Sequence, residues 1–291
     1  MALKSSILCS IVIAFIISST VSLPVKSHDH DTHGERFERE GLPDVAKVAE
    51  RSICGTVHPS RDVAEQVERH HKAHAHHYLS TVSSGVTVRV HFHLITDGEY
   101  QNVVKDATRR LTRQVQILNA AYNNVTNTGN IFPITFQLGT IQRHVTADER
   151  LLQIIPPGGF SMYQAKSAWR IGGPLDLNVY VTSFIDLYRG PLGVATFPWD
   201  YAKDPVSDGV IMLYTALPYL PGEAIKENNL GVVLVHEVGH WVGLYHTFQE
   251  WGDEGWCSGP GDFVNDTAMQ NSPSDGGCDA EQESCQNDGS L

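Results

Sequence analysis

Three histidines and one glutamate lie within eleven residues of one another in the last third of the sequence. His236 and His240 are four positions apart, so on a helix both imidazoles lie on one face, one turn apart. Two imidazoles placed in this way can bind the same zinc ion at about 2.0–2.1 Å. Glu237 points about 100° away from His236 around the helix, close enough to hold a water molecule on the metal without being a ligand. The pattern therefore predicts a zinc site on a helix.

A third ligand is expected just beyond the end of that helix. Gly243 can adopt the left-handed conformation that ends a helix, so the chain can turn and bring His246 to the metal. Three protein ligands and a water molecule are typical of a catalytic zinc site, whereas four protein ligands close a structural site. The alternative is a core helix with incidental histidines, which would then be buried without partners at a high free-energy cost. We therefore interpret His236, His240 and His246 as zinc ligands.

The rest of the pattern predicts a mixed α/β domain that positions this helix. Five segments alternate or are rich in β-branched residues and are predicted as strands: 86–95, 134–145, 177–181, 193–197 and 209–214. Pro191 and Pro198 flank the fourth segment, which favours a place at the edge of the sheet. Apolar residues at spacings of three and four predict an amphipathic helix over 103–123. Asn228 or Asn229 is predicted to cap the zinc-binding helix, which would end near residue 242.

The composition is that of a globular, acidic chain. Of its 291 residues, 41% are hydrophobic, which is enough apolar surface for a core. The formal net charge is −12. This acidic balance argues against nucleic acid, or an anionic membrane, as a partner.

The first 22 residues have the layout of a secretory signal peptide. Lys4 precedes an apolar run over 7–17, and small residues suited to cleavage follow. An uncleaved membrane anchor is the alternative, but the run covers only about half of a bilayer span. We therefore expect a secreted, extracellular protein. Asn124 and Asn265 stand in sequons and are candidates for glycosylation.

Residues 23–84 are predicted to form a pro-region or N-terminal arm. They contain nine of the fifteen histidines, including a tract at 70–77 that is interpreted as a solvated, flexible arm rather than a metal site. A boundary is placed near 80–85, and residues 85–291 are predicted to form one compact domain. His91 and His93, on the first predicted strand, are interpreted as packed or surface histidines rather than ligands.

The spacing HExxHxxGxxH over 236–246 is the long zinc signature of the metzincin metalloproteases. The wider context resembles the pappalysin family, and in particular its secreted fungal extracellular metalloproteases. The residues that carry this resemblance are Gly193–Trp199 before the zinc signature and Cys257, Gly261–Thr267, Cys278 and Cys285 after it. The resemblance runs from about Cys54 to the C-terminus. It implies an α/β (α+β) metzincin-like fold: a twisted, mixed five-stranded sheet, an active-site helix, a backing helix, and an irregular, disulfide-containing C-terminal part.

The resemblance also implies an activity. It identifies residues 85–291 as the catalytic domain of a zinc-dependent endopeptidase that acts on proteins or peptides, with Glu237 as the general base. The edge strand formed by Gly193, Val194, Ala195 and Thr196 would pair with an extended substrate by strand addition. Two alternatives are a catalytically impaired relative that binds zinc, and a secreted protein that sequesters metal with the histidine tract.

Secretion would place the cysteines in an oxidising compartment, where disulfides are the default. Cys257, Cys278 and Cys285 are the disulfide candidates. Cys54 lies in the predicted pro-region, from which a thiolate can occupy the fourth position of a zinc site and block it. Latency of this kind is known among metzincins, and we favour it over the alternative, a disulfide between Cys54 and Cys278.

The segment after His246 is acidic, with ten Asp or Glu residues and no Lys or Arg. Asp262, Asp266 and Thr267 match a segment that binds structural calcium in some pappalysins, and hard oxygen ligands suit Ca²⁺. An acidic surface loop is the alternative interpretation of these residues.

The sequence departs from the family pattern near its end. Metzincins have a methionine-containing turn below the metal, and in pappalysins a tyrosine follows that methionine two residues later. Met269 is the only methionine after the zinc signature, it lies where the family places another segment, and no tyrosine follows Tyr245. We therefore expect a chain that is truncated before the methionine turn.

Overall fold

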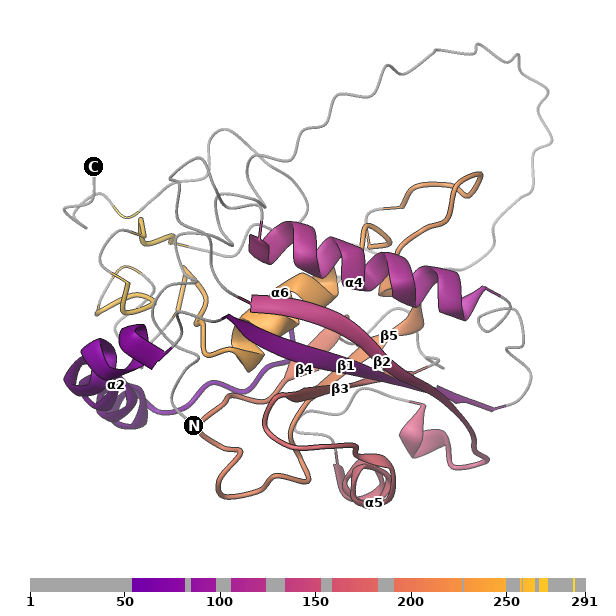
Figure 1. Cartoon of the computed structure of the whole chain (residues 1–291), viewed down its shortest axis with the longest axis horizontal. Helices are drawn as coiled ribbons and strands as arrows, with labels where there is room; N and C mark the ends of the chain where they lie inside the picture. The colour runs from indigo at the N-terminus through magenta and orange to yellow at the C-terminus, as the bar shows by residue number, and fades with distance from the viewer. Residues whose placement is uncertain are drawn as a thin grey trace, which may run out of the picture.

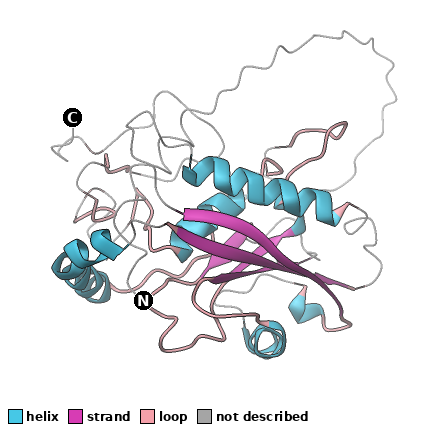
Figure 2. Ribbon diagram, viewed as in Figure 1, coloured by secondary structure: helices cyan, strands magenta, loops and turns pink. Residues whose placement is uncertain are grey.

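The computed structural model describes residues 54–81, 85–97, 106–123, 134–152, 159–182, 191–226, 228–249, 257, 259–264, 267–271 and 285. A five-stranded sheet in the order β2-β1-β3-β5-β4 forms the centre of this part (Figure 1, Figure 2). The strands are β1 (Val86–Thr96), β2 (Ile134–Val145), β3 (Asp176–Thr182), β4 (Gly193–Ala195) and β5 (Val210–Leu213). Only β4 is antiparallel to its neighbour in the sheet; the other pairs are parallel. The mixed five-stranded sheet predicted from the sequence is confirmed.

Helices lie on both sides of the sheet. On one side, α4 (Ala107–Asn123) packs against β2, and α6 (Val232–Trp241) packs against β4, β5 and α4; on the other side lies α5 (Gly159–Trp169) (Figure 1). The short 3₁₀ helices are η1 (Glu149–Leu151) and η2 (Tyr214–Ala216). The core between sheet and helices includes Phe92, Leu111, Leu118, Val179, Leu234 and Trp241. No helix in the described part of the chain has both the length and the hydropathy of a membrane span.

The predicted strands agree with the observed ones to within two residues at each end. The strand predicted between two prolines, β4, is at the edge of the sheet, as expected. In α4, the apolar stripe faces the core and the opposite face is exposed. Because of this division, the spacing of its apolar residues predicts the helix. His91 and His93 on β1 are buried and hydrogen-bonded to Asp176 and Asn178, in agreement with packed histidines.

The predicted cap of α6 is wrong. The N-cap is Gly231, which has a left-handed φ of 81° and no side chain to cap the helix. Asn229 instead closes the preceding turn by accepting a hydrogen bond from the backbone N–H of Lys226 at 2.7 Å. A Cβ on Gly231 would come within 2.8 Å of Ile117, so close packing against α4 selects glycine there. Tertiary contact therefore outweighs local capping preference.

The N-terminal arm is more ordered than expected. Residues 61–81 form a helix, α2 (Arg61–Thr81), so the histidine tract at 70–77 is helical rather than a flexible arm. Ala64 and His71, seven residues apart on one face, are buried. α2 also continues into the stretch 80–85 where the boundary was placed, and the division of the chain into domains stays a prediction.

The C-terminal part contains a disulfide between Cys257 and Cys285, two of the three predicted candidates. Cys278 lies outside the described residues. Cys54 is not part of a disulfide, so the alternative pairing of Cys54 with Cys278 does not occur in this structure.

Candidate metal centre

The three histidines of the zinc signature converge on one point. His236 and His240 project from consecutive turns of α6, and the chain then turns at Gly243, whose φ is 108°, to return His246 to the same place. The three Nε2 atoms lie 3.1, 3.1 and 3.2 Å from one another. The sulfur of Cys54 joins them, and all four donor atoms lie within 4.8 Å of one another.

The surroundings leave these nitrogens ready to act as ligands. Nδ1 of His240 donates a hydrogen bond to the carbonyl of Leu244 at 2.7 Å, which leaves Nε2 as the ring's acceptor atom. Burial lowers the pKa of His236 to about 4, and burial with the neighbouring imidazoles lowers the pKa of His246 to about 2. Metal binding requires neutral imidazole, so these pKa shifts favour the ligand form.

The donor geometry fits a small tetrahedral ion. Zinc bonds of about 2.0–2.1 Å would hold ligand nitrogens roughly 3.4 Å apart, close to the observed separations of 3.1 to 3.2 Å. Imidazole nitrogen and thiolate sulfur are also the donors that such an ion prefers. These residues therefore can hold a metal ion.

Glu237 is buried beside this cluster, next to the edge strand. A Cβ on Gly193 would come within 2.6 Å of the Glu237 Cγ, so the first residue of β4 has to be glycine for the carboxylate to fit. Burial raises the pKa of Glu237 to about 8, and hydrogen bonds with Thr56 and Cys54 act in the opposite direction. The Thr56 hydroxyl donates to the Glu237 Oε2 at 2.9 Å.

The N-terminal segment lies along the edge strand. Cys54 forms a parallel bridge with Gly193, and the N–H of Gly55 donates to the Gly193 carbonyl at 2.9 Å. Two residues further, the N–H of Ala195 donates to the Thr56 hydroxyl at 2.9 Å. The Cys54 sulfur lies 3.5 Å from the His240 Nε2, and burial raises the pKa of its thiol. In this structure the segment therefore covers both the cluster of His236, His240 and His246 and the strand predicted to bind substrate.

The other predicted site residues are placed as follows. Val194 lies in β4, and Thr196 follows it with its hydroxyl close to Asp208 and Gly209. Asp262 is buried and accepts a hydrogen bond from the N–H of Val264, which closes a turn. Among the described residues, Asp262 is not part of a group of carboxylates or histidines that could hold a metal ion. Asp266, Asn124 and Asn265 lie outside the described residues. Calcium binding and glycosylation stay predictions.

Two residues near the cluster were missed at the level of sequence. Thr56 connects Glu237 to β4, and the His58 ring lies 4.7 Å from the His246 ring, centroid to centroid. Neither belongs to a motif, and both follow Cys54 in a segment that pattern analysis treats as an arm. Only pairing of that segment with β4 reveals them.

Sequence comparisons identify the family of this chain. It is 32% identical to an extracellular metalloprotease of Arthroderma benhamiae over 248 residues. This aligned region covers 83% of this chain and 74% of that relative. The chain belongs to the pappalysin family of metalloproteases. The matching M43 peptidase family model, described as pregnancy-associated plasma protein-A, spans residues 169–290. An extracellular metalloprotease of Neurospora crassa is also 32% identical, over 80% of this chain and 74% of that protein.

Two solved structures resemble this chain in fold. Mature mirolysin of Tannerella forsythia, in complex with a cleaved peptide, is 28% identical with a TM-score of 0.50, over 65% of this chain and 74% of that one. A promirolysin variant from the same organism is 25% identical with a TM-score of 0.52, over 76% of this chain and 77% of that one. These likenesses confirm the metzincin-like fold expected from the zinc signature.

Proposed function

We propose that this chain is a secreted, zinc-dependent endopeptidase, produced in a latent form. The observation that carries the proposal is the convergence of three histidine Nε2 atoms, 3.1 to 3.2 Å apart, beside a buried glutamate on the same helix. Membership of a metalloprotease family supports hydrolysis of proteins. The signal-peptide pattern, the Cys257–Cys285 disulfide and the extracellular metalloproteases among the relatives support secretion.

His236, His240 and His246 would hold the zinc ion, and Cys54 would be a fourth ligand in the latent form. When bound, zinc supplies Lewis-acid chemistry, since it polarises a carbonyl group and lowers the pKa of water. The hydrogen bond from His240 to the Leu244 carbonyl keeps that ligand oriented.

Glu237 would serve as the general base and then the general acid. Its carboxylate would take a proton from the attacking water and return it to the leaving amine of the scissile bond. Gly193 supports this assignment because its missing side chain leaves room for the carboxylate directly beside β4. Substrate paired with β4 would therefore bring its backbone to Glu237.

The N-terminal segment would keep the enzyme latent in three ways. Cys54 lies where a fourth metal ligand would lie, Thr56 binds the Glu237 carboxylate, and Gly55 and Thr56 occupy backbone groups of β4. Displacement of this segment would open the metal, the base and the edge strand together.

Hydrolysis of a denatured protein tests the proposal directly. The full chain is purified, its N-terminal segment is released by limited proteolysis, and cleavage is followed with and without a zinc chelator. Activity that the chelator abolishes, that added zinc restores and that Glu237→Ala lacks is the expected result. A folded chain with one bound zinc and no hydrolysis would contradict it and would indicate a zinc-binding relative without activity.

A further inference from the structure

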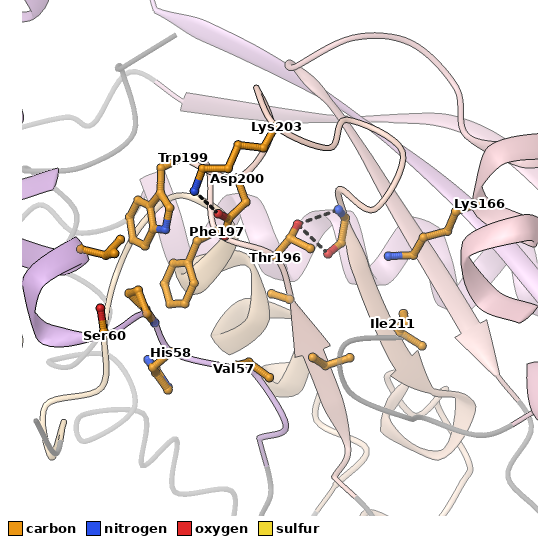
Figure 3. Close-up of a pocket in the computed structure, with 15 residues that line it drawn as sticks. Val57, His58, Ser60, Lys166, Thr196, Phe197, Trp199, Asp200, Lys203 and Ile211 are labelled. Atoms are coloured by element: carbon orange, nitrogen blue, oxygen red, sulfur yellow. Dashed lines mark hydrogen bonds and ion pairs between the residues drawn. The ribbon is translucent and has the colours of Figure 1, made fainter. Parts of the chain in front are cut away.

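Three aromatic side chains form a continuous surface beside the metal-binding cluster. Phe197 and Trp199 stack with ring centroids 4.5 Å apart (Figure 3). The Tyr245 ring lies 5.5 Å from that of Phe197 and 5.6 Å from that of Trp199, centroid to centroid. The Phe197 ring is also 5.6 Å from that of His240. We call Phe197, Trp199 and Tyr245 the aromatic surface. None of these rings has a role in the hydrolysis proposed above.

The N-terminal segment covers the aromatic surface. Ala64, on the first turn of α2, is fully buried against it, and the His58 ring lies 5.6 Å from that of Phe197. Under this cover Phe197 is only 2% exposed and Tyr245 only 6%. Release of the segment would therefore expose a contiguous apolar patch beside the metal, and such patches mark binding sites.

A cavity remains between the segment and this part of the domain. Its volume is about 370 Å³, and its lining includes His58, Val194, Phe197, Trp199 and Ile211 (Figure 3). Three charged side chains are part of the lining: Asp200 and Lys203, which lie 3.3 Å apart, and the buried Lys166. The Lys166 ammonium donates a hydrogen bond to the Ser207 carbonyl at 2.7 Å, so each of these charges already has a partner. The space is large enough for a ring side chain.

His58 shows what kind of group the aromatic surface accepts. Its ring packs among the rings of Phe197, Tyr245 and His246. Both of its ring nitrogens are buried and have no hydrogen-bond partner among the described residues. The position therefore holds a planar ring by packing and does not use its polarity, so an apolar ring would fit it at a lower desolvation cost.

The aromatic surface continues directly from the edge strand. Gly193, the first residue of β4, lies beside Glu237, and Phe197 comes two residues after the last residue of β4. A chain that pairs with β4 at Gly193 therefore reaches Phe197 about four residues further along, as the N-terminal segment does from Cys54, which pairs with Gly193, to His58, which packs on Phe197.

From this geometry we infer that the aromatic surface is a specificity subsite for the protein substrate proposed above. It takes an aromatic side chain of the substrate, on one side of the scissile bond and within about four residues of it. His58 occupies the subsite in the latent chain. Antiparallel pairing with β4 would place the aromatic residue on the amino-terminal side of the bond, whereas parallel pairing, as in the Cys54 segment, would place it on the carboxyl side.

Cleavage of matched peptides tests the subsite. The full chain, activated by limited proteolysis, is given a series of peptides in which phenylalanine replaces alanine at each of four positions on either side of the cleaved bond. At one position we expect kcat/KM to rise about tenfold or more, because a phenylalanine ring becomes buried. Trp199→Ala should bring the ratio of kcat/KM for the phenylalanine peptide to kcat/KM for the alanine peptide towards one. Tyr163→Ala, which removes an exposed aromatic ring on α5, is the matched control and should leave the ratio unchanged.

The same experiment separates this inference from the proposed function. Cleavage of the all-alanine peptide with no gain from phenylalanine at any position would overturn the subsite and leave the protease assignment intact. Failure to cleave any peptide or denatured protein would overturn the assignment itself. A gain that Trp199→Ala does not reduce would place the aromatic preference elsewhere and would also contradict the inference.

A second measurement uses the latent chain and does not depend on Trp199. If the subsite binds rings by packing, His58→Phe should prolong the lag before activity appears during proteolytic activation, and His58→Ala should shorten it. Equal lags for wild type and both variants would contradict the role of the aromatic surface.

Discussion

At the scale of one residue, the imidazole of His240 shows how the surrounding chain orients a proposed metal ligand. The carbonyl of Leu244, in the turn after α6, accepts the Nδ1 proton and directs Nε2 towards the other two histidines. The turn that supplies this carbonyl also returns His246, so one feature of the backbone orients one ligand and delivers another. Gly243, with φ of 108°, permits that turn.

Replacing the buried carboxylate of Glu237 should separate metal binding from catalysis. In Glu237→Gln the amide keeps the shape of the side chain and can still accept the Thr56 hydroxyl, but it cannot take a proton from water. We expect kcat/KM of the activated chain to fall by at least about 10²-fold, as for loss of a general base. Zinc content, measured by atomic absorption, should stay at one ion per chain. Retained activity would exclude Glu237 as the base.

The Thr56 hydroxyl should contribute to latency through its two hydrogen bonds. Thr56→Val keeps the volume but leaves the Glu237 Oε2 and the Ala195 N–H without this partner, at a cost of about 1–3 kcal/mol for a buried group. The unactivated full chain should then show higher residual activity than wild type, and Thr56→Ser should restore latency. After activation all three chains should be equally active. A Thr56→Val chain as latent as wild type would contradict this role.

At the scale of the elements, strong periodicity predicted most of the sheet and part of the site. Alternation or β-branched composition located all five strands, and the spacing of His236 and His240 predicted that both project from one face of α6. The predictions that failed concern features that depend on contacts between distant segments. Gly231 caps α6 because Ile117 leaves no space for a side chain there. The same holds for Thr56, whose partners lie 139 and 181 residues away.

Asp176, the first residue of β3, ties that strand to β1. Its carboxylate accepts hydrogen bonds from Arg89 at 2.7 Å, from the Gly173 N–H at 2.8 Å and from His91 at 3.1 Å. Burial alone would raise the pKa of Asp176, but these hydrogen bonds outweigh it and lower the pKa to about 2. The ionised form is thus favoured in the folded chain.

Asp176→Asn should therefore destabilise the fold in a pH-dependent way. Because the folded pKa lies below the unfolded value near 4, the stabilisation is complete above about pH 5 and is lost as pH falls towards 2. We expect the variant to lose about 2 kcal/mol of unfolding free energy at pH 7, and the difference from wild type to narrow below pH 4. Urea unfolding at both pH values measures it. A difference that does not depend on pH would show that the side chain acts through packing alone.

At the scale of the whole molecule, the N-terminal segment contacts every part of the proposed active site. Cys54 contacts the histidine cluster, Thr56 contacts Glu237 and β4, and His58 and Ala64 contact the aromatic surface. If Cys54 binds the metal, then metal and segment must stabilise each other by linkage. Removing the metal should consequently make local opening of α2 more frequent, even though α2 itself contains no ligand of the cluster.

Limited trypsin digestion of the full chain tests this coupling. Arg69 and Lys72 are exposed but helical, so cleavage there requires α2 to open. A chelator should speed this cleavage several-fold in wild type, because the sulfur loses its metal. In Cys54→Ser, cleavage should be fast with or without the chelator. Cleavage at Arg109 in α4 is the control for general unfolding, and its rate should change little. If the chelator speeds cleavage of α2 equally in both chains, Cys54 does not couple the metal to the segment. The contacts of Thr56 and of the aromatic surface would then be what stabilises the segment on the rest of the chain.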